Sequence, residues 1–195
     1  MARTAGRSAD ETKRLILDAA AHLIGRHGTA VPVSDIAEAA GVSKGGLLYH
    51  FPNKEELLNG LATDLMTRFR QNVEQAASEE EDRRPGRLTR AYIRVSFAHA
   101  GDLTGLRDYI ALAAHLMFEP GLEELAQQDA KQWRSALLDD GLDPAVIRVV
   151  IAATDGSNSA PLWGAVLNDT DRAELEADLI ALTYRVGSPA GTCSG

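Results

Sequence analysis

Cysteine, aromatic residues and long apolar runs are all scarce in this sequence of 195 residues. The single cysteine, Cys193, has no partner for an internal disulfide and suits a reducing compartment. No run of 18 apolar residues occurs, so we expect no transmembrane helix. The two arginines before position 8 precede no apolar stretch, which argues against a secretory signal. We therefore expect a cytoplasmic protein that does not enter a membrane.

The sequence also lacks the motifs of common enzymes. It contains no HExxH, no CxxC, no G-x-S-x-G and no phosphate-binding glycine loop. His115 and Glu119 are four residues apart, but two ligands make a weak metal site and such a pair is more often hydrogen-bonded. We expect no catalytic residues, no metal and no cofactor. A small all-α enzyme remains the alternative from another functional class.

The net charge of −8 is unevenly distributed along the chain. Residues 1–54 carry seven Lys or Arg against five Asp or Glu, whereas residues 55–195 carry thirteen against twenty-three. Phosphate would attract the first segment and repel the second. This asymmetry indicates a nucleic-acid-facing N-terminal part joined to an acidic body.

Apolar residues recur at helical spacing throughout the chain, and no segment shows sustained period-two alternation. The pattern predicts an all-α protein of about nine helices. Ser8 and Glu11 have the spacing of a capping box for the first helix. The longer helices are expected at about 54–77, 87–100, 103–118, 122–140, 144–167 with a kink at Pro161, and 172–185. A charged linker at 78–86 separates the first two of these helices.

Residues 33–51 form the most informative stretch. Ile36, Ala37 and Ala40 share one face of a short helix, and Gly41 follows where a sharp turn favours glycine. Ser43 is a good N-cap for a second short helix. Two helices joined by a tight glycine turn are typical of a DNA-binding helix-turn-helix. A helical hairpin within a bundle fits the same pattern.

The run DIAEAAGVSKGGLLYHFPNKEELL resembles the DNA-binding domain of the TetR family of bacterial transcription regulators. The resemblance extends from about Thr12 to Leu61 and includes the YHF-x-NKEEL run after the second helix. It implies a helix-turn-helix domain at 1–53, with three helices and a flexible N-terminal arm. It also implies a C-terminal helical bundle at 54–195 for ligand binding and dimerisation, connected to the first domain by its first helix.

The outer face of the second short helix and the resemblance together predict the DNA-binding residues. They are Ser34, Ser43, Lys44, Gly45, Gly46, Leu48, Tyr49, His50 and Lys54. Lys44 is placed to reach a base edge or a phosphate, and the resemblance implies backbone contacts for Ser43, Tyr49, His50 and Lys54. The two glycines permit close approach of the helix to DNA, and Leu48 either touches a thymine methyl or packs inward.

Large apolar side chains and a few polar ones fall on helices of the body that should face one another. We expect ligand-binding residues among Phe69, Ser96, Phe97, His99, Met117, Phe118, Trp133, Asp155, Asn158 and Trp163. Pockets are mostly apolar with a few placed polar groups, although an ordinary core has the same composition. The resemblance favours a pocket. No Lys or Arg follows Arg148 in the helix expected at 144–167, so an uncharged or weakly cationic ligand fits better unless Arg94 or Arg134 turns inward.

The last two expected helices carry apolar and small residues that need a partner surface, which predicts a homodimer. The residues concerned are Ala152, Ala153, Ser157, Ala160, Leu175, Leu179 and Leu182. The sequence thus predicts a ligand-responsive transcriptional regulator, with a repressor as the favoured interpretation, that binds a palindromic double-stranded DNA operator and is released by a small effector. A DNA-binding regulator without a ligand is the other interpretation.

Overall fold

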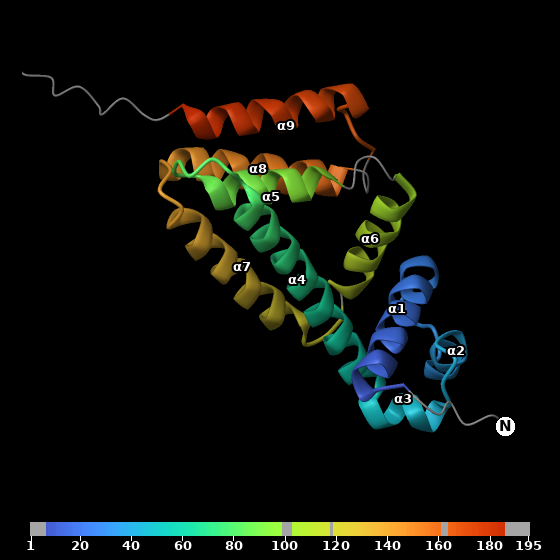
Figure 1. Cartoon of the computed structure of the whole chain (residues 1–195). Helices are drawn as coiled ribbons and strands as arrows, with labels where there is room; N and C mark the ends of the chain where they lie inside the picture. Colours follow the sequence, from blue (N-terminus) through green and yellow to red (C-terminus); the bar gives the residue numbers. More distant parts are fainter. Residues whose placement is uncertain (1–6, 99–102, 118, 161–163, 186–195) are drawn as a thin grey trace, which may run out of the picture. The chain divides into compact units, whose positions relative to one another are not determined.

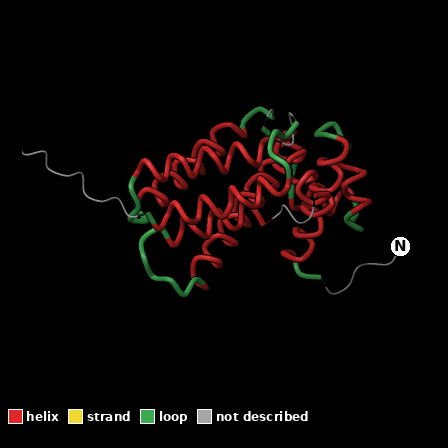
Figure 2. The backbone as a smooth tube through the Cα atoms, turned by 90° about the horizontal axis from the view of Figure 1, so that it is seen from above, coloured by secondary structure: helices red, strands yellow, loops and turns green. Residues whose placement is uncertain are grey.

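The computed structural model describes residues 7–98, 103–117, 119–160 and 164–185. Within these ranges it contains nine α-helices and no strand (Figures 1 and 2), which confirms the all-α prediction. The helices are α1 (Ala9–His27), α2 (Val33–Ala39), α3 (Lys44–His50), α4 (Lys54–Glu79), α5 (Arg87–Ala98), α6 (Leu103–Leu116), α7 (Leu122–Leu138), α8 (Pro144–Ser159) and α9 (Asp169–Tyr184). Across the described ranges, no helix combines the length and apolarity needed to span a bilayer.

The chain forms two compact units, and each is described separately. Unit 1 comprises residues 1–67 and 107–126, and unit 2 comprises residues 68–106 and 127–195. Helices α4, α6 and α7 therefore contribute to both units. Residues 107–126, which the sequence analysis placed with the C-terminal domain, belong to unit 1 together with the helix-turn-helix.

Unit 1 is built around α1, whose start follows from its sequence. The Ser8 hydroxyl accepts a hydrogen bond from the Glu11 N–H at 3.1 Å, and the Glu11 carboxylate accepts one from the Ser8 N–H at 2.7 Å. This capping box is the predicted one. The helix ends at Gly28, whose positive φ of 77° suits a residue without Cβ.

One apolar core holds unit 1 together. Residues from α1, α2, α3 and α4 meet in it, and α6 and the start of α7 complete it with three leucines. The largest buried members are Ile16, Leu17, Ile24, Ile36, Leu47, Phe51, Leu57, Leu58, Leu61, Leu112, Leu116 and Leu122. The position of the short α3 is thus fixed by burial on its inner side.

Unit 2 packs α5 against both α8 and α9. One buried cluster contains Val73, Ala91, Leu137 and Ile147, and a second contains Ile93, Phe97, Val150 and Leu179. The two clusters lie on either side of α5, because Ala91 belongs to the first and Ile93 to the second. Helix α5 is therefore the central element of this unit.

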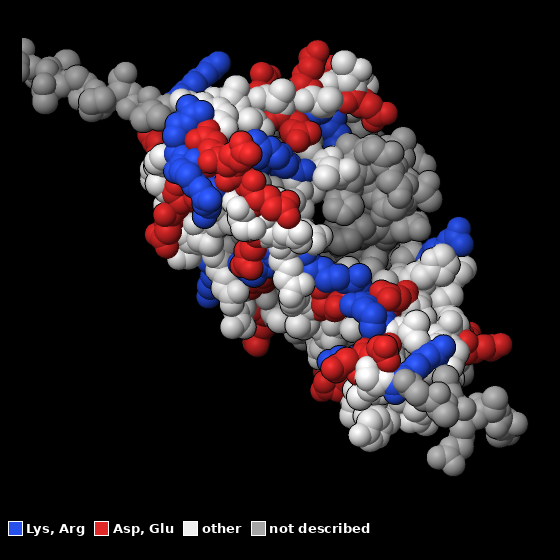
Figure 3. Space-filling model, viewed as in Figure 1, with Lys and Arg blue, Asp and Glu red and all other residues white. Residues whose placement is uncertain are grey.

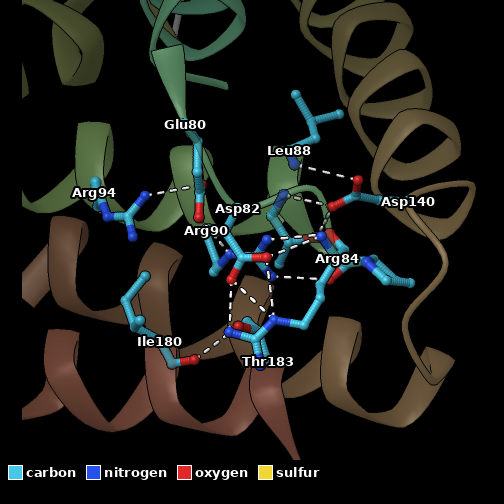
Figure 4. A network of polar contacts seen from close by, with 11 residues as sticks. Glu80, Asp82, Arg84, Leu88, Arg90, Arg94, Asp140, Ile180 and Thr183 are labelled. Carbon is cyan, nitrogen blue, oxygen red and sulfur yellow. Dashed lines mark hydrogen bonds and ion pairs between the residues drawn. The ribbon is translucent and has the colours of Figure 1, made fainter. Parts of the chain in front are cut away.

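A polar network ties the α4–α5 connection to α5 and α9 (Figure 4). Its centre is Arg90, whose side chain is fully buried and whose Nε donates to Glu80 Oε1 at 2.8 Å. The same guanidinium donates to the backbone carbonyls of Pro85 and Arg84 and lies 4.7 Å from the ring centroid of Tyr184. We call this set the Arg90 network. The segment predicted as a charged linker is thus anchored by a buried ion pair between Glu80 and Arg90.

Two predictions about the last helices are wrong. Helix α8 ends at Ser159 rather than near Leu167, while Pro161 lies outside the described residues. Helix α9 begins at Asp169 rather than Arg172, because Asn168 forms a capping box with Asp171.

The side of α9 expected to face a partner also needs correction. Leu179 is 3% exposed and packs in its own unit against Ile93, Phe97 and Val150. Ser157 on α8 is likewise buried. Leu175 packs against the same cluster, so these two leucines of α9 face the core of their own chain.

Candidate functional site

The α2–α3 turn has the geometry that its residues predict. Gly41 adopts a positive φ of 66°, and the Val42 N–H donates to the Ala37 carbonyl at 3.0 Å. The Ser43 hydroxyl caps α3 by accepting from the Gly46 N–H at 3.0 Å. These contacts determine the direction in which α3 leaves the turn.

Burial at the other end of α3 fixes its rotation. Leu47 is fully buried and Phe51 is 4% exposed. A Cβ on Gly60 of α4 would lie only 2.6 Å from Cε1 of Phe51, so the glycine provides the space for that ring. With Leu47 and Phe51 held inside, the opposite side of α3 must face outward.

The outward side of α3 exposes few but prominent side chains. Tyr49 is 82% exposed and meets the ring of His50 edge-on at 5.2 Å. Lys44 and Gly45 are also exposed, whereas Leu48 packs partly buried against the unit 1 core. This face combines one cation, one aromatic ring and a stretch of bare backbone.

Two predicted contact residues already have partners within unit 1. Lys54 Nζ donates to the Val31 carbonyl at 2.8 Å, and the Ser34 hydroxyl donates to the Asp35 carboxylate at 3.0 Å. Because an ammonium group has three donors, Lys54 retains capacity for a further acceptor. The contact with Val31 also joins the start of α4 to the segment before α2.

On the face shown in Figure 3, acidic and basic side chains of the described residues are interspersed rather than separated by sign. Attraction to phosphate on this face would therefore depend on individual cations.

A second candidate site lies in unit 2, where three aromatic rings meet. Phe69 of α4, Tyr92 of α5 and Trp133 of α7 have ring centroids 5.2–5.7 Å apart. The Arg70 guanidinium lies 4.3 Å from the Trp133 ring and is paired with Asp129 at 2.7 Å. Such clusters supply large, rigid apolar surfaces.

Polar groups adjoin these rings. The Tyr92 hydroxyl donates to Asp155 Oδ1 at 3.3 Å. Burial raises the pKa of Asp155 above its ordinary value, and the tyrosine hydrogen bond partly opposes this rise. The hydroxyls of Ser96 and Thr154 are buried and, among the described residues, have no hydrogen-bond partner.

The structure brings together only some of the predicted ligand-binding residues. Phe69 and Trp133 share the aromatic cluster, and Asp155 touches it through Tyr92. Phe97 is instead buried beside Val150, and the Asn158 side-chain oxygen Oδ1 accepts from Arg172 at 3.2 Å. Met117 is 66% exposed and belongs to unit 1. His99, Phe118 and Trp163 lie outside the described residues.

Sequence reasoning missed Tyr92. Its position one helical turn before Ser96 was the available signal, since both residues then share a face of α5.

No group of three potential metal ligands occurs in the described part of the chain. His115 packs over the end of α1, where a Cβ on Gly28 would lie 3.5 Å from its Cε1 atom.

Comparisons with known proteins agree with this architecture. Residues 16–61 match the family model described as bacterial regulatory proteins, tetR family, and residues 86–184 match that of the tetracyclin repressor-like C-terminal domain. The repressor KstR2 of Mycobacterium tuberculosis is 30% identical over 152 residues, which cover 76% of this chain and 74% of that protein.

Other relatives match over different extents. KstR2 of Rhodococcus jostii is 41% identical over 75 residues, and the match spans only 36% of the length of each protein. Among solved structures, the multidrug binding protein EbrR complexed with malachite green is 27% identical with a TM-score of 0.66, covering 88% of this chain and 97% of EbrR. The two family models and the extended match to KstR2 lead to one conclusion: this chain belongs to the TetR family of bacterial transcriptional regulators, which are DNA-binding proteins and not enzymes.

Proposed function

We propose that this protein is a cytoplasmic, ligand-responsive transcriptional repressor. It binds a palindromic operator as a homodimer and leaves DNA when a small, mainly apolar molecule occupies unit 2. The observation that carries the DNA-binding part is the exposed face of α3, with Tyr49 82% exposed and Lys44 at the first turn of the helix. A helix presented in this way suits the major groove.

The residues proposed to touch DNA have different tasks. Lys44 reads a base edge or contacts a phosphate. Ser43, Tyr49, His50 and Lys54 contact the DNA backbone and position unit 1 on it. Gly45 and Gly46 leave the α3 backbone bare, so that it approaches the groove closely. Ser34 is exposed at the start of α2, where a hydroxyl can reach a phosphate.

Homodimer formation is supported by the outer faces of α8 and α9. On α9, Ala173, Ala177 and Ala181 recur every four residues, and all three are exposed. On α8, Val149 is 51% exposed, and a Cβ on Gly156 would meet no described atom within 4 Å. Small residues at this spacing let a second copy approach closely. Twofold pairing would set two α3 helices about 34 Å apart, one turn of DNA, or a multiple of it.

The ligand response is supported by the second candidate site. Tyr92 of the aromatic cluster precedes Ser96 by one turn of α5, and the buried Ser96 hydroxyl has no partner among the described residues, a situation that is rare in native proteins. The solved complex of EbrR with malachite green adds support from a relative of 27% identity. A ligand shifts DNA affinity only as far as it prefers one of the two states of the protein.

Selection of bound duplexes from a random DNA pool tests the proposal. We expect enrichment of a palindromic consensus whose half-sites are separated by about one helical turn. The selected duplex then serves as the probe in a screen for small molecules that release it. Failure to enrich any sequence would refute sequence-specific binding, and an unpaired half-site would refute the dimeric operator.

A further inference from the structure

On two neighbouring helices of unit 2, polar residues lie one turn beyond residues of the apolar core. On α5, Ser96 follows Tyr92 by one turn, and on α8, Asp155 follows Ile151 by one turn. Tyr92 and Ile151 both pack in the first core cluster. The hydrogen bond from Tyr92 to Asp155, at 3.3 Å, shows that the two turns lie side by side. We call this place the polar end of the core.

Two hydroxyls at or beside the polar end are buried without partners. Ser96 is 3% exposed and Thr154, the neighbour of Asp155, is fully buried. Neither hydroxyl has a hydrogen-bond partner among the described residues. Buried hydroxyls in folded proteins usually have a hydrogen-bond partner in the protein or in water, so these two side chains can still bond to another molecule. They therefore point to an occupant that can offer or accept hydrogen bonds.

The carboxylate at the polar end lacks a cationic partner. No Lys or Arg of the described ranges forms an ion pair with Asp155, which remains accessible from solvent. The arginines that flank the region are engaged elsewhere. Arg70 pairs with Asp129 at 2.7 Å, and Arg94 pairs with Glu80 at 2.9 Å. Partial burial raises the pKa of Asp155, as expected for a carboxylate without a compensating positive charge.

Aromatic faces adjoin this carboxylate. The Tyr92 ring lies 5.7 Å from the Phe69 ring and 5.2 Å from the Trp133 ring. Aromatic faces attract cations, and one face of Trp133 already holds the Arg70 guanidinium at 4.3 Å. A carboxylate beside such rings matches a ligand whose positive centre carries apolar groups.

We infer that the polar end of the core binds an amphipathic organic cation. Its positive centre meets Asp155 and the Tyr92 ring, and its apolar part lies against Phe69 and Trp133. A donor or acceptor on the ligand satisfies Ser96. The inference rests on the proposed ligand response and names the chemical class of the effector.

Arg172 of α9 is the group that would favour an anion instead. Its guanidinium donates to the Ser157 carbonyl at 2.9 Å and to Asn158 Oδ1 at 3.2 Å, and it lies 5.1 Å from the Phe97 ring. Burial lowers its pKa. These contacts place Arg172 beside the second core cluster, whereas Asp155 faces the first through Tyr92. An anion bound at Arg172 would not satisfy Asp155.

Three probes of similar shape separate charge from apolar contact. Tetraphenylphosphonium is a cation, tetraphenylborate is the matching anion, and triphenylphosphine oxide is neutral. Isothermal titration calorimetry of the full chain in sodium buffer is expected to show tighter binding of the cation than of the anion, by about tenfold or more. Asp155→Asn should remove this preference and leave the affinity for the neutral probe unchanged. Asp139→Asn, which removes an exposed carboxylate of the same unit, should bind all three probes as the wild type does.

Equal binding of the two ions, preference for tetraphenylborate, or no binding of any probe would overturn the inference. A cation preference that survives in Asp155→Asn would also overturn it. The operator probe distinguishes these failures from failure of the proposed function. Cation binding that leaves operator affinity unchanged would contradict the ligand response of the proposed function, whereas charge-independent binding that releases DNA would contradict only the ligand class.

Discussion

Replacing Gly45 with alanine should stabilise the protein and weaken its binding to DNA. Gly45 lies in α3 with its backbone exposed, and beyond the adjoining residues and the helix backbone the nearest described atom to an added Cβ would be Ser43 Oγ, 4.0 Å away. The fold itself therefore does not require glycine there. Alanine is favoured over glycine in helices by about 1 kcal/mol, so we expect Tm to rise by about 2–4 °C.

Operator affinity should move in the opposite direction. Gly45 and Tyr49 are four residues apart and share the exposed face of α3. If that face lies against DNA, the new methyl group occupies space that the groove needs. Forcing a methyl group into a packed contact costs about 1–3 kcal/mol, which corresponds to roughly 5- to 150-fold weaker binding.

Gly46→Ala is the matched control. A Cβ at this position would lie 3.3 Å from Ser43 Oγ and 3.8 Å from Val42 Cβ. Because the Ser43 hydroxyl caps α3 through the Gly46 N–H at 3.0 Å, the added methyl group would disturb the cap. Loss of a cap costs about 1 kcal/mol, so the gain in helix propensity should be cancelled and Tm should not rise.

Calorimetry at one protein concentration and anisotropy titration of a selected duplex give the two readouts. A fixed concentration is necessary because the Tm of a dimer depends on it. The reasoning is refuted if Gly45→Ala binds the duplex as tightly as the wild type. It is also refuted if the variant is less stable, since the added methyl group then meets something that the structure does not show.

Four further predictions address other residues. Lys54→Ala should reduce affinity for all duplexes and lower the slope of log affinity against log salt by about one. If Lys44 reads a base, Lys44→Ala should relax the sequence preference at one position by roughly 1–3 kcal/mol. Wild-type salt dependence in both variants would exclude these two residues from the DNA interface. Arg90→Met should lower the free energy of unfolding in urea by about 3 kcal/mol, because it leaves the buried Glu80 carboxylate with the half-exposed Arg94 in place of its buried partner, and a loss below about 1 kcal/mol would contradict this. Ala177→Arg should yield a monomer by light scattering with unchanged helix content, and a persistent dimer would exclude the outer face of α9. Asp155→Asn should stabilise the ligand-free protein at pH 7, because the pKa of Asp155 is raised in the folded state and the wild type therefore loses stability as pH rises above the ordinary pKa of 3.8. Below that pH the difference in stability between the variant and the wild type should vanish. Equal stability at pH 7 would argue against a desolvated carboxylate.

Local signals made much of the fold predictable. The Ser8–Glu11 capping box and the Ser43 cap both form as their spacing indicates. The partners in each of these features are only a few residues apart, so their spacing in the sequence is enough to predict the contact. The same is true of the α2–α3 turn, where Gly41 has the positive φ that its position requires.

Features that depend on distant residues were not predictable. Helical spacing grouped Leu175, Leu179 and Leu182 on one face but did not show that α5 and α8 cover it. Arg90 gave no sign of burial, since arginine is usually exposed unless a partner such as Glu80 is brought to it by the fold. For the proposed ligand site, composition identified Trp133 and Asp155 but not Tyr92, which contacts Asp155 only because α5 lies next to α8.

The Arg90 network has a consequence for protein engineering. A charged stretch ending in Pro85-Gly86 would ordinarily be chosen for inserting a reporter domain or a linker. Here the carbonyls of Arg84 and Pro85 accept from the buried guanidinium, and the side chains of Arg84 and Arg90 both lie against the Tyr184 ring. An insertion between Glu80 and Arg90 would separate these partners and release the end of α9. A biosensor built from this protein should therefore keep the α4–α5 connection at its native length and carry its reporter elsewhere.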